Sequence, residues 1–73
     1  MNPEEKILKF ISDQLGIPLE ELKPDSDLTL DLGIGPVELA DLLTNLENKF
    51  AIKIPEEERL KIKTINQIIN LNE

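Results

Sequence analysis

Proline placed directly after a capping residue marks the start of each long helix predicted in this chain. Asn2 precedes Pro3, and a glutamate follows three residues after Asn2 in a capping-box arrangement. Gly35 precedes Pro36 in the same way, and Glu38 lies in the first turn, where the helix dipole favours a carboxylate. Because proline suits the first helical position and disrupts a helix interior, these two points predict where the main helices begin.

Apolar residues recur at helical spacing after each of these starts. The first run stops at Gly16, which predicts a helix over residues 3–15, and the second run predicts a helix that begins at Pro36 and ends near Phe50. The side chains expected to face inward are Ile7, Leu8, Phe10, Ile11 and Leu15 in the first helix, and Leu39, Leu43, Leu46 and Phe50 in the second, flanked by Ala40 and Leu42.

The remaining segments are shorter and are interrupted by turn-forming residues. Residues 17–33 are expected to form a long loop pinned by leucines 19, 22, 28, 30 and 32, with room for a helical turn at 19–22. A short helix opening on Pro55 and a last helix starting at Thr64 complete the pattern, with Ile65, Ile68, Ile69 and Leu71 inward. The sequence therefore predicts one all-α domain over residues 1–73, a bundle of three main helices plus one short helix.

The composition excludes most catalytic and metal-binding classes. The chain has no cysteine and no histidine, which removes thiolate nucleophiles, the usual zinc ligands and the commonest general base near neutral pH. No apolar run approaches the roughly 20 residues of a membrane span. The N-terminus has no basic, then apolar, signal-like pattern, so a cytoplasmic location is expected. We expect a protein that is not an enzyme.

The net charge indicates which partners the chain can bind. Fifteen acidic residues against eight basic ones leave a net charge of −7, the wrong sign for nucleic acid or an anionic membrane surface. A basic surface of another protein is the natural partner, and the alternative is that the charge serves solubility alone. Only Phe10 and Phe50 are aromatic, which leaves no stacking platform for bases.

One stretch of acidic residues resembles part of a calcium loop. Asp25, Asp27 and Asp31 have the alternating spacing of its ligands, but Leu30 stands where that loop needs glycine and Pro36 where it needs glutamate. The simpler interpretation is that Asp25, Ser26 and Asp27 cap local turns. We predict no metal site.

The segment from Asp31 to Phe50, which reads DLGIGPVELADLLTNLENKF, resembles the central part of the acyl carrier protein family. The resemblance extends over nearly the whole chain: the Gln14-Leu15-Gly16 end of the first helix, the long loop, the Ile54-Pro55-Glu56-Glu57 turn and the Thr64-Ile65 start all stand at family spacing. It implies an acyl-carrier-like helical bundle with a long loop between the first two helices.

The same resemblance implies a site that this chain lacks. The family carries acyl or related chains on a 4′-phosphopantetheine arm attached to the serine of an Asp-Ser-Leu motif at the start of the second helix. In that register this chain has Gly35-Pro36-Val37. Pro36 has no hydroxyl, so no phosphodiester to the arm can form there, and we expect no bound cofactor. An engineered inactivation would normally change the serine alone, whereas three altered positions indicate a natural loss.

The resemblance also implies a docking face, because family members meet basic partner enzymes through acidic residues on the second helix. Val37, Glu38, Asp41 and Glu47 stand at family-like positions, and the alternative is a plain solvated helix face. We therefore expect a monomeric interaction module, an adaptor, scaffold or regulator of a partner enzyme. Two alternatives stay open: a protein that binds a free fatty acid or acyl-CoA noncovalently, and a conventional carrier of fatty-acid or polyketide biosynthesis, against which Pro36 stands.

Overall fold

The computed structural model describes residues 2–71, and helices are its only extended secondary-structure elements within that range. Its elements are α1 (Pro3–Leu15), the short 3₁₀ helix η1 (Leu19–Glu21), α2 (Pro36–Phe50), α3 (Glu56–Arg59) and α4 (Ile65–Asn70). Within residues 2–71 no strand is present, which confirms the predicted all-α fold with three main helices and one short one.

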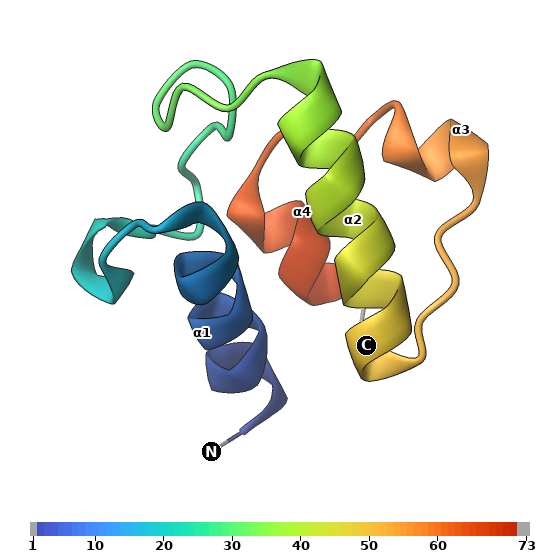
Figure 1. The fold of residues 1–73 in the computed structure, drawn as a ribbon, viewed down its shortest axis with the longest axis horizontal. Helices are drawn as coiled ribbons and strands as arrows, with labels where there is room; N and C mark the ends of the chain where they lie inside the picture. Colours follow the sequence, from blue (N-terminus) through green and yellow to red (C-terminus); the bar gives the residue numbers. More distant parts are fainter. Residues whose placement is uncertain (1, 72–73) are drawn as a thin grey trace.

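The two long helices run in opposite directions (Figure 1). α1 contacts α2, and α4 lies between them in this view, while α3 lies on the side of α2 away from α1. The start of α2 and the N-terminal end of α1 are therefore at opposite ends of the molecule (Figure 1). None of the helices within the described residues is both long and apolar enough to span a membrane.

The helix starts are those predicted from the capping residues. The Asn2 side chain accepts a hydrogen bond from the Glu5 amide at 2.8 Å, and Pro3 is the first helical residue. α2 starts at Pro36 as expected, although its capping residue Gly35 has no side chain. The Gly35 amide instead donates to the Glu38 carboxylate at 3.5 Å, which supplies half of a capping box.

The long helices end in the left-handed conformation, one at a favourable residue and one at an unfavourable one. Gly16 has a φ of 69° after α1, as its sequence position predicted. Ala51 has a φ of 53° after α2, where its Cβ makes the same conformation costly. The short helix α3 starts at Glu56, so Pro55 is its capping residue and not its first residue.

The hydrophobic core collects residues from every α-helix except α3. The fully buried side chains, less than 2% exposed, are Ile7, Ile11, Leu28, Leu42, Leu43, Leu46, Ile65 and Ile68. The predicted face of α1 is confirmed, with Leu8, Phe10 and Leu15 packed at its edge. The predicted face of α2 is rotated: Leu42 is at its centre, Leu39 and Phe50 are half-buried, and Ala40 is exposed. The spacing within α2 could not show which side of its apolar stripe would be most deeply buried.

The loop before α2 is held by fewer leucines than predicted. Leu22 and Leu28 are buried, whereas Leu19 is 47% exposed and Leu30 is 83% exposed. Backbone hydrogen bonds to the segment before α4 hold the loop instead: the Leu28 amide donates to the Lys63 carbonyl, and the Asn66 amide donates to the Pro24 carbonyl, each at 2.8 Å. These bonds fix the path by which the chain reaches the start of α2.

Candidate functional site at the start of α2

The first two turns of α2 present exposed side chains, of which Glu38 accepts one hydrogen bond within the fold, from the Gly35 amide. Val37 is 73% exposed, and Glu38 and Asp41 are also exposed. Residues four apart on a helix are neighbours, so Val37 and Asp41 share one face of α2. The arrangement is an apolar side chain beside two carboxylates, with Pro36 directly before it.

The chemistry available at this point is limited by Pro36, the first residue of α2. Its pyrrolidine ring carries no hydroxyl, thiol or amine, so its side chain cannot form a covalent bond to a group transferred from another molecule. Gly35 before it and Val37 after it are also without a nucleophile. A phosphopantetheine arm needs a hydroxyl for its phosphodiester, and the start of α2 therefore does not fit that group.

The serines of the chain lie elsewhere and are used by the fold. Ser12, in α1, donates from Oγ to the Ile17 carbonyl at 2.5 Å and so fastens the end of the helix. Ser26 is 9% exposed, and its backbone bonds to Lys23 and Ile65. Neither serine is presented at the start of a long helix.

Of the predicted docking residues, Glu47 makes the most contacts within the molecule, whereas Glu38 only accepts from the Gly35 amide. One carboxylate oxygen accepts from the Ile54 amide at 2.8 Å, and the other accepts from the Arg59 guanidinium at 2.6 Å. The side chain is only 22% exposed. Glu47 thus holds the segment after α2 in place, unlike Val37 and Asp41, and its docking role stays a prediction.

Arg59 makes structural contacts beside the site that the sequence did not indicate. Besides Glu47, its guanidinium donates to the Ala40 carbonyl at 3.1 Å and to the Thr44 hydroxyl at 3.0 Å. It therefore ties α3 to the side of α2 over three successive turns. The separation of Arg59 from these partners, 12 to 19 residues, follows no helical periodicity that could have shown the contact.

A small hollow lies between the first half of α2 and α3. Its volume is about 300 Å³, at the lower limit of the roughly 300–1,000 Å³ usual for ligand pockets. The lining residues are mostly apolar, with Arg59 on one wall: Pro36, Leu39, Ala40, Leu43, Glu56, Arg59, Leu60 and Ile62. Such a hollow suits an aliphatic group better than a charged one.

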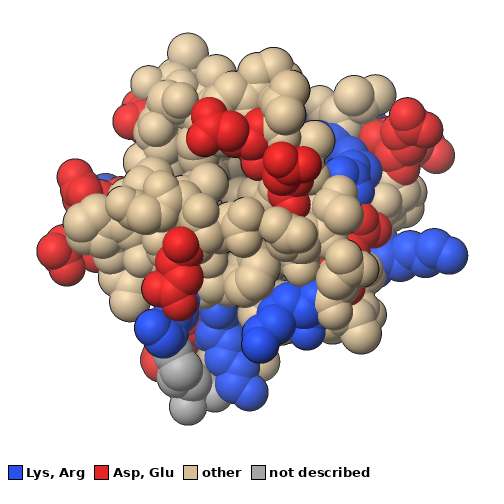
Figure 2. All heavy atoms as spheres, in the orientation of Figure 1, with Lys and Arg blue, Asp and Glu red and all other residues tan. Residues whose placement is uncertain are grey.

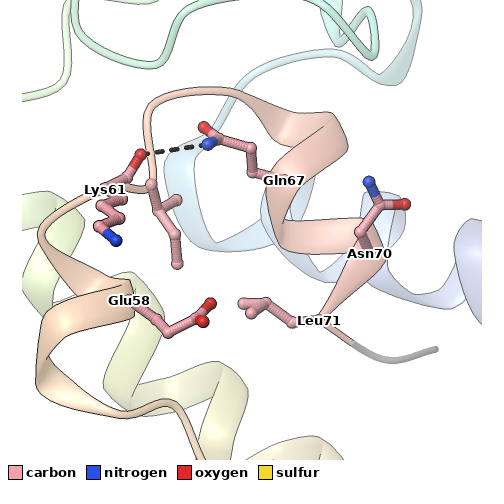
Figure 3. A pocket seen from close by; sticks show the side chains of 6 residues that line it. Glu58, Lys61, Gln67, Asn70 and Leu71 are labelled. Atoms are coloured by element: carbon pink, nitrogen blue, oxygen red, sulfur yellow. Dashed lines mark hydrogen bonds between the residues drawn. The ribbon is translucent and has the colours of Figure 1, made fainter.

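A second hollow lies between α3 and α4 and is of a different kind. Glu58 of α3 and Leu71 after α4 point toward its middle, and Asn70 lies at its edge (Figure 3). The Gln67 amide nitrogen donates to the Lys61 carbonyl at 3.1 Å across its rim. This bond joins α4 to the segment that leads into it. The residues around the hollow therefore have a structural role.

The aspartates considered as calcium ligands form a capped turn. One oxygen of Asp27 accepts from the Thr29 and Leu30 amides at 2.9 and 2.8 Å, and Asp31 accepts from the Asp27 amide at 2.7 Å. Among the described residues no group of three or more potential metal ligands is assembled. The turn-capping interpretation is confirmed for Asp27.

Comparison with known proteins identifies the family of this chain. The family model for the phosphopantetheine attachment site matches residues 5–71. An acyl carrier protein of Nitratidesulfovibrio vulgaris (strain DSM 19637 / Miyazaki F) is 39% identical over 69 residues, which cover 94% of this chain and 91% of the relative. The match therefore includes the whole bundle and the start of α2. This chain belongs to the acyl carrier protein family.

Proposed function

We propose that this protein is a carrier-like interaction module without a covalent cargo, which presents the start of α2 to a basic surface of a partner protein. The observation that carries the proposal is Pro36 at the first position of α2. The resemblance to the family implies a serine at this position. The protein would act as an adaptor, scaffold or regulator of a partner enzyme and would catalyse no reaction itself.

The exposed triad of Val37, Glu38 and Asp41 supports the docking part of this proposal. Its carboxylates have no cationic partner among residues 2–71, so they are free to meet lysines or arginines of another protein. Exposed ion pairs contribute only about 0–1 kcal/mol each and mainly guide the encounter. We therefore expect binding of modest affinity that weakens as salt is added.

The loss of the attachment point is tested by restoring it. The chain and its Gly35→Asp, Pro36→Ser double variant are incubated with coenzyme A and a phosphopantetheinyl transferase of broad specificity, and intact masses are measured. We expect the arm on the double variant alone. An arm on the unaltered chain would overturn the proposal. An arm on neither protein would show that the bundle lacks a carrier's recognition surface.

The docking face is tested with the same transferase as a stand-in for a partner that recognises carriers. Glu38→Lys and Asp41→Lys are added to the restored variant, and the rate of arm transfer is compared with that of a control carrying Glu20→Lys and Glu21→Lys. Both pairs change the net charge equally. We expect transfer to slow about tenfold in the first protein and little in the control, with the difference shrinking at high salt. Equal slowing would mean that only net charge matters.

A second candidate function rests on the apolar hollow between α2 and α3. A free fatty acid or acyl-CoA could place its aliphatic end against Leu39 and Leu43 without any covalent bond. Native mass spectrometry of protein purified from its own cells distinguishes the two functions, because a lipid adduct supports the second and a bare chain supports the first. Ala40→Trp, at an exposed residue that lines the hollow, would fill it and should remove the adduct.

A further inference from the structure

Lysines surround a pair of phenylalanines at the end of the molecule opposite the start of α2. The rings of Phe10 and Phe50 pack edge to face, with centroids 5.8 Å apart and planes at 81°. Lys6, Lys9 and Lys49 line an open hollow of about 720 Å³ over these rings, together with Asp13. Figure 2 shows blue, basic side chains gathered along the lower edge of the view, where α1 begins and α2 ends. We call these three lysines and two phenylalanines the lysine–phenylalanine patch.

The charges of this patch are not used by the fold. Lys9 and Asp13 are 3.6 Å apart, but both side chains are more than half exposed, and such pairs contribute about 0.3–0.5 kcal/mol. Lys6 and Lys49 form no ion pair within residues 2–71. Phe10 and Phe50 are only half-buried at the edge of the core. In the described part of the chain, Lys6 and Lys49 therefore offer positive charge without an ion-pair partner, beside apolar ring surface.

The charge of the whole protein restricts what can cover the patch. With a net charge of −7, the molecule repels an extended polyanion such as nucleic acid or an anionic membrane. A short acidic segment can contact the lysines alone and stay within about one Debye length of them. An apolar side chain in that segment can then cover the exposed edges of the two rings.

We propose that the lysine–phenylalanine patch is a second docking site, which binds a short acidic segment of another protein with an apolar side chain at its centre. This site is separate from the start of α2, so one molecule can hold a basic partner at one end and an acidic partner at the other. The proposal does not depend on the missing serine or on the first docking face.

The probe is the blocked peptide acetyl-Glu-Glu-Leu-Phe-Glu-Glu-amide, titrated into ¹⁵N-labelled protein and followed by two-dimensional NMR. We expect saturable shifts in the amides of residues 6–13 and 49–53, with little change at residues 35–41. Lys6→Glu with Lys49→Glu should weaken binding at least about tenfold, since two attractions become repulsions. Lys23→Glu with Lys61→Glu is the matched control and should change binding about twofold or less, because these lysines lie outside the hollow.

Two further peptides separate the contributions to binding. Glutamine in place of every glutamate removes the charge, and serine in place of leucine and phenylalanine removes the apolar centre. Both peptides should bind more weakly than the probe. Shifts that are spread over the whole surface, or equal losses in the two lysine pairs, would overturn the proposal.

Other occupants of the patch give distinct results that would also overturn it. Shifts at residues 6–13 and 49–53 that appear on concentrating the protein without peptide would identify a second copy of this chain as the occupant. Patch-dependent binding to phosphatidylglycerol vesicles, with no binding of the peptide, would identify a membrane surface.

Discussion

The two halves of α2 carry acidic residues that do different work. In the first half, Glu38 and Asp41 are exposed and free of cations among the described residues. In the second half, Glu47 is held by the Ile54 amide and Arg59 and is only 22% exposed. Carboxylates on one helix therefore differ: two are exposed to solvent and one is held by the fold. A count of acidic residues on a helix does not measure a docking face.

The largest difference between the two halves of α2 is expected when Glu47 and Asp41 are each replaced by alanine. Glu47→Ala should lower the free energy of unfolding by about 2–3 kcal/mol, because it leaves the Ile54 amide and the Arg59 guanidinium without their acceptor. Asp41→Ala should change it by less than about 0.5 kcal/mol. Urea unfolding followed by circular dichroism measures both, and equal losses would show that the two halves do not differ.

A smaller effect is expected from Arg59→Lys, which keeps the charge and loses the shape. A lysine ammonium cannot reach Ala40, Thr44 and Glu47 at once as the planar guanidinium does, so the free energy of unfolding should fall by about 1 kcal/mol. Lys61→Arg is the control for the reverse exchange and should be neutral in the same unfolding assay. A stable Arg59→Lys variant would mean that the ion pair alone holds α3.

A substitution at the end of α2 is expected to stabilise the protein. Ala51→Gly should raise the free energy of unfolding by about 0.5–1 kcal/mol, because glycine adopts the left-handed conformation without the Cβ penalty. Gly16→Ala, at the matching position after α1, should lower it by about 1 kcal/mol. Thermal unfolding of the two variants should shift in opposite directions, and a shift of both in one direction would contradict this explanation.

The smallest effect is expected at the start of α2. Pro36→Ala should lower the free energy of unfolding by only ~0.5 kcal/mol, since proline at the first helical position chiefly restricts the unfolded chain. The measurement is chemical unfolding beside the parent protein. A loss above about 2 kcal/mol would show that Pro36 is needed for the fold, and its presence would then have a structural explanation instead of a functional one.

The parts of the fold that depend on local chemistry could be predicted from the sequence. The bounds of α1 and the start of α2 follow from Asn2-Pro3, Gly16 and Gly35-Pro36, because capping and proline placement act within one helical turn. The start of the last helix at Thr64 was predicted for the same reason and is confirmed, since the Thr64 hydroxyl accepts from the Gln67 amide and caps α4.

The parts that depend on distant contacts could not be predicted. Leu30 looks like its buried neighbour Leu28 in the sequence, and only the backbone bonds of the loop to the α4 start decide which of the two faces inward. Glu47 looks like Glu38 until Arg59 is placed beside it by the return of the chain. At the candidate site, the absence of a hydroxyl was readable in the sequence, whereas the exposure of Val37 needed the structure.

The central claim, that this family member carries no phosphopantetheine arm, is tested most directly on protein isolated from the cells that make it. Intact mass spectrometry of that protein should give the mass of the unmodified polypeptide. Fragmentation of the protein ion should release no pantetheine group. A mass increased by one phosphopantetheine, on any residue, would contradict the account and make the protein a working carrier.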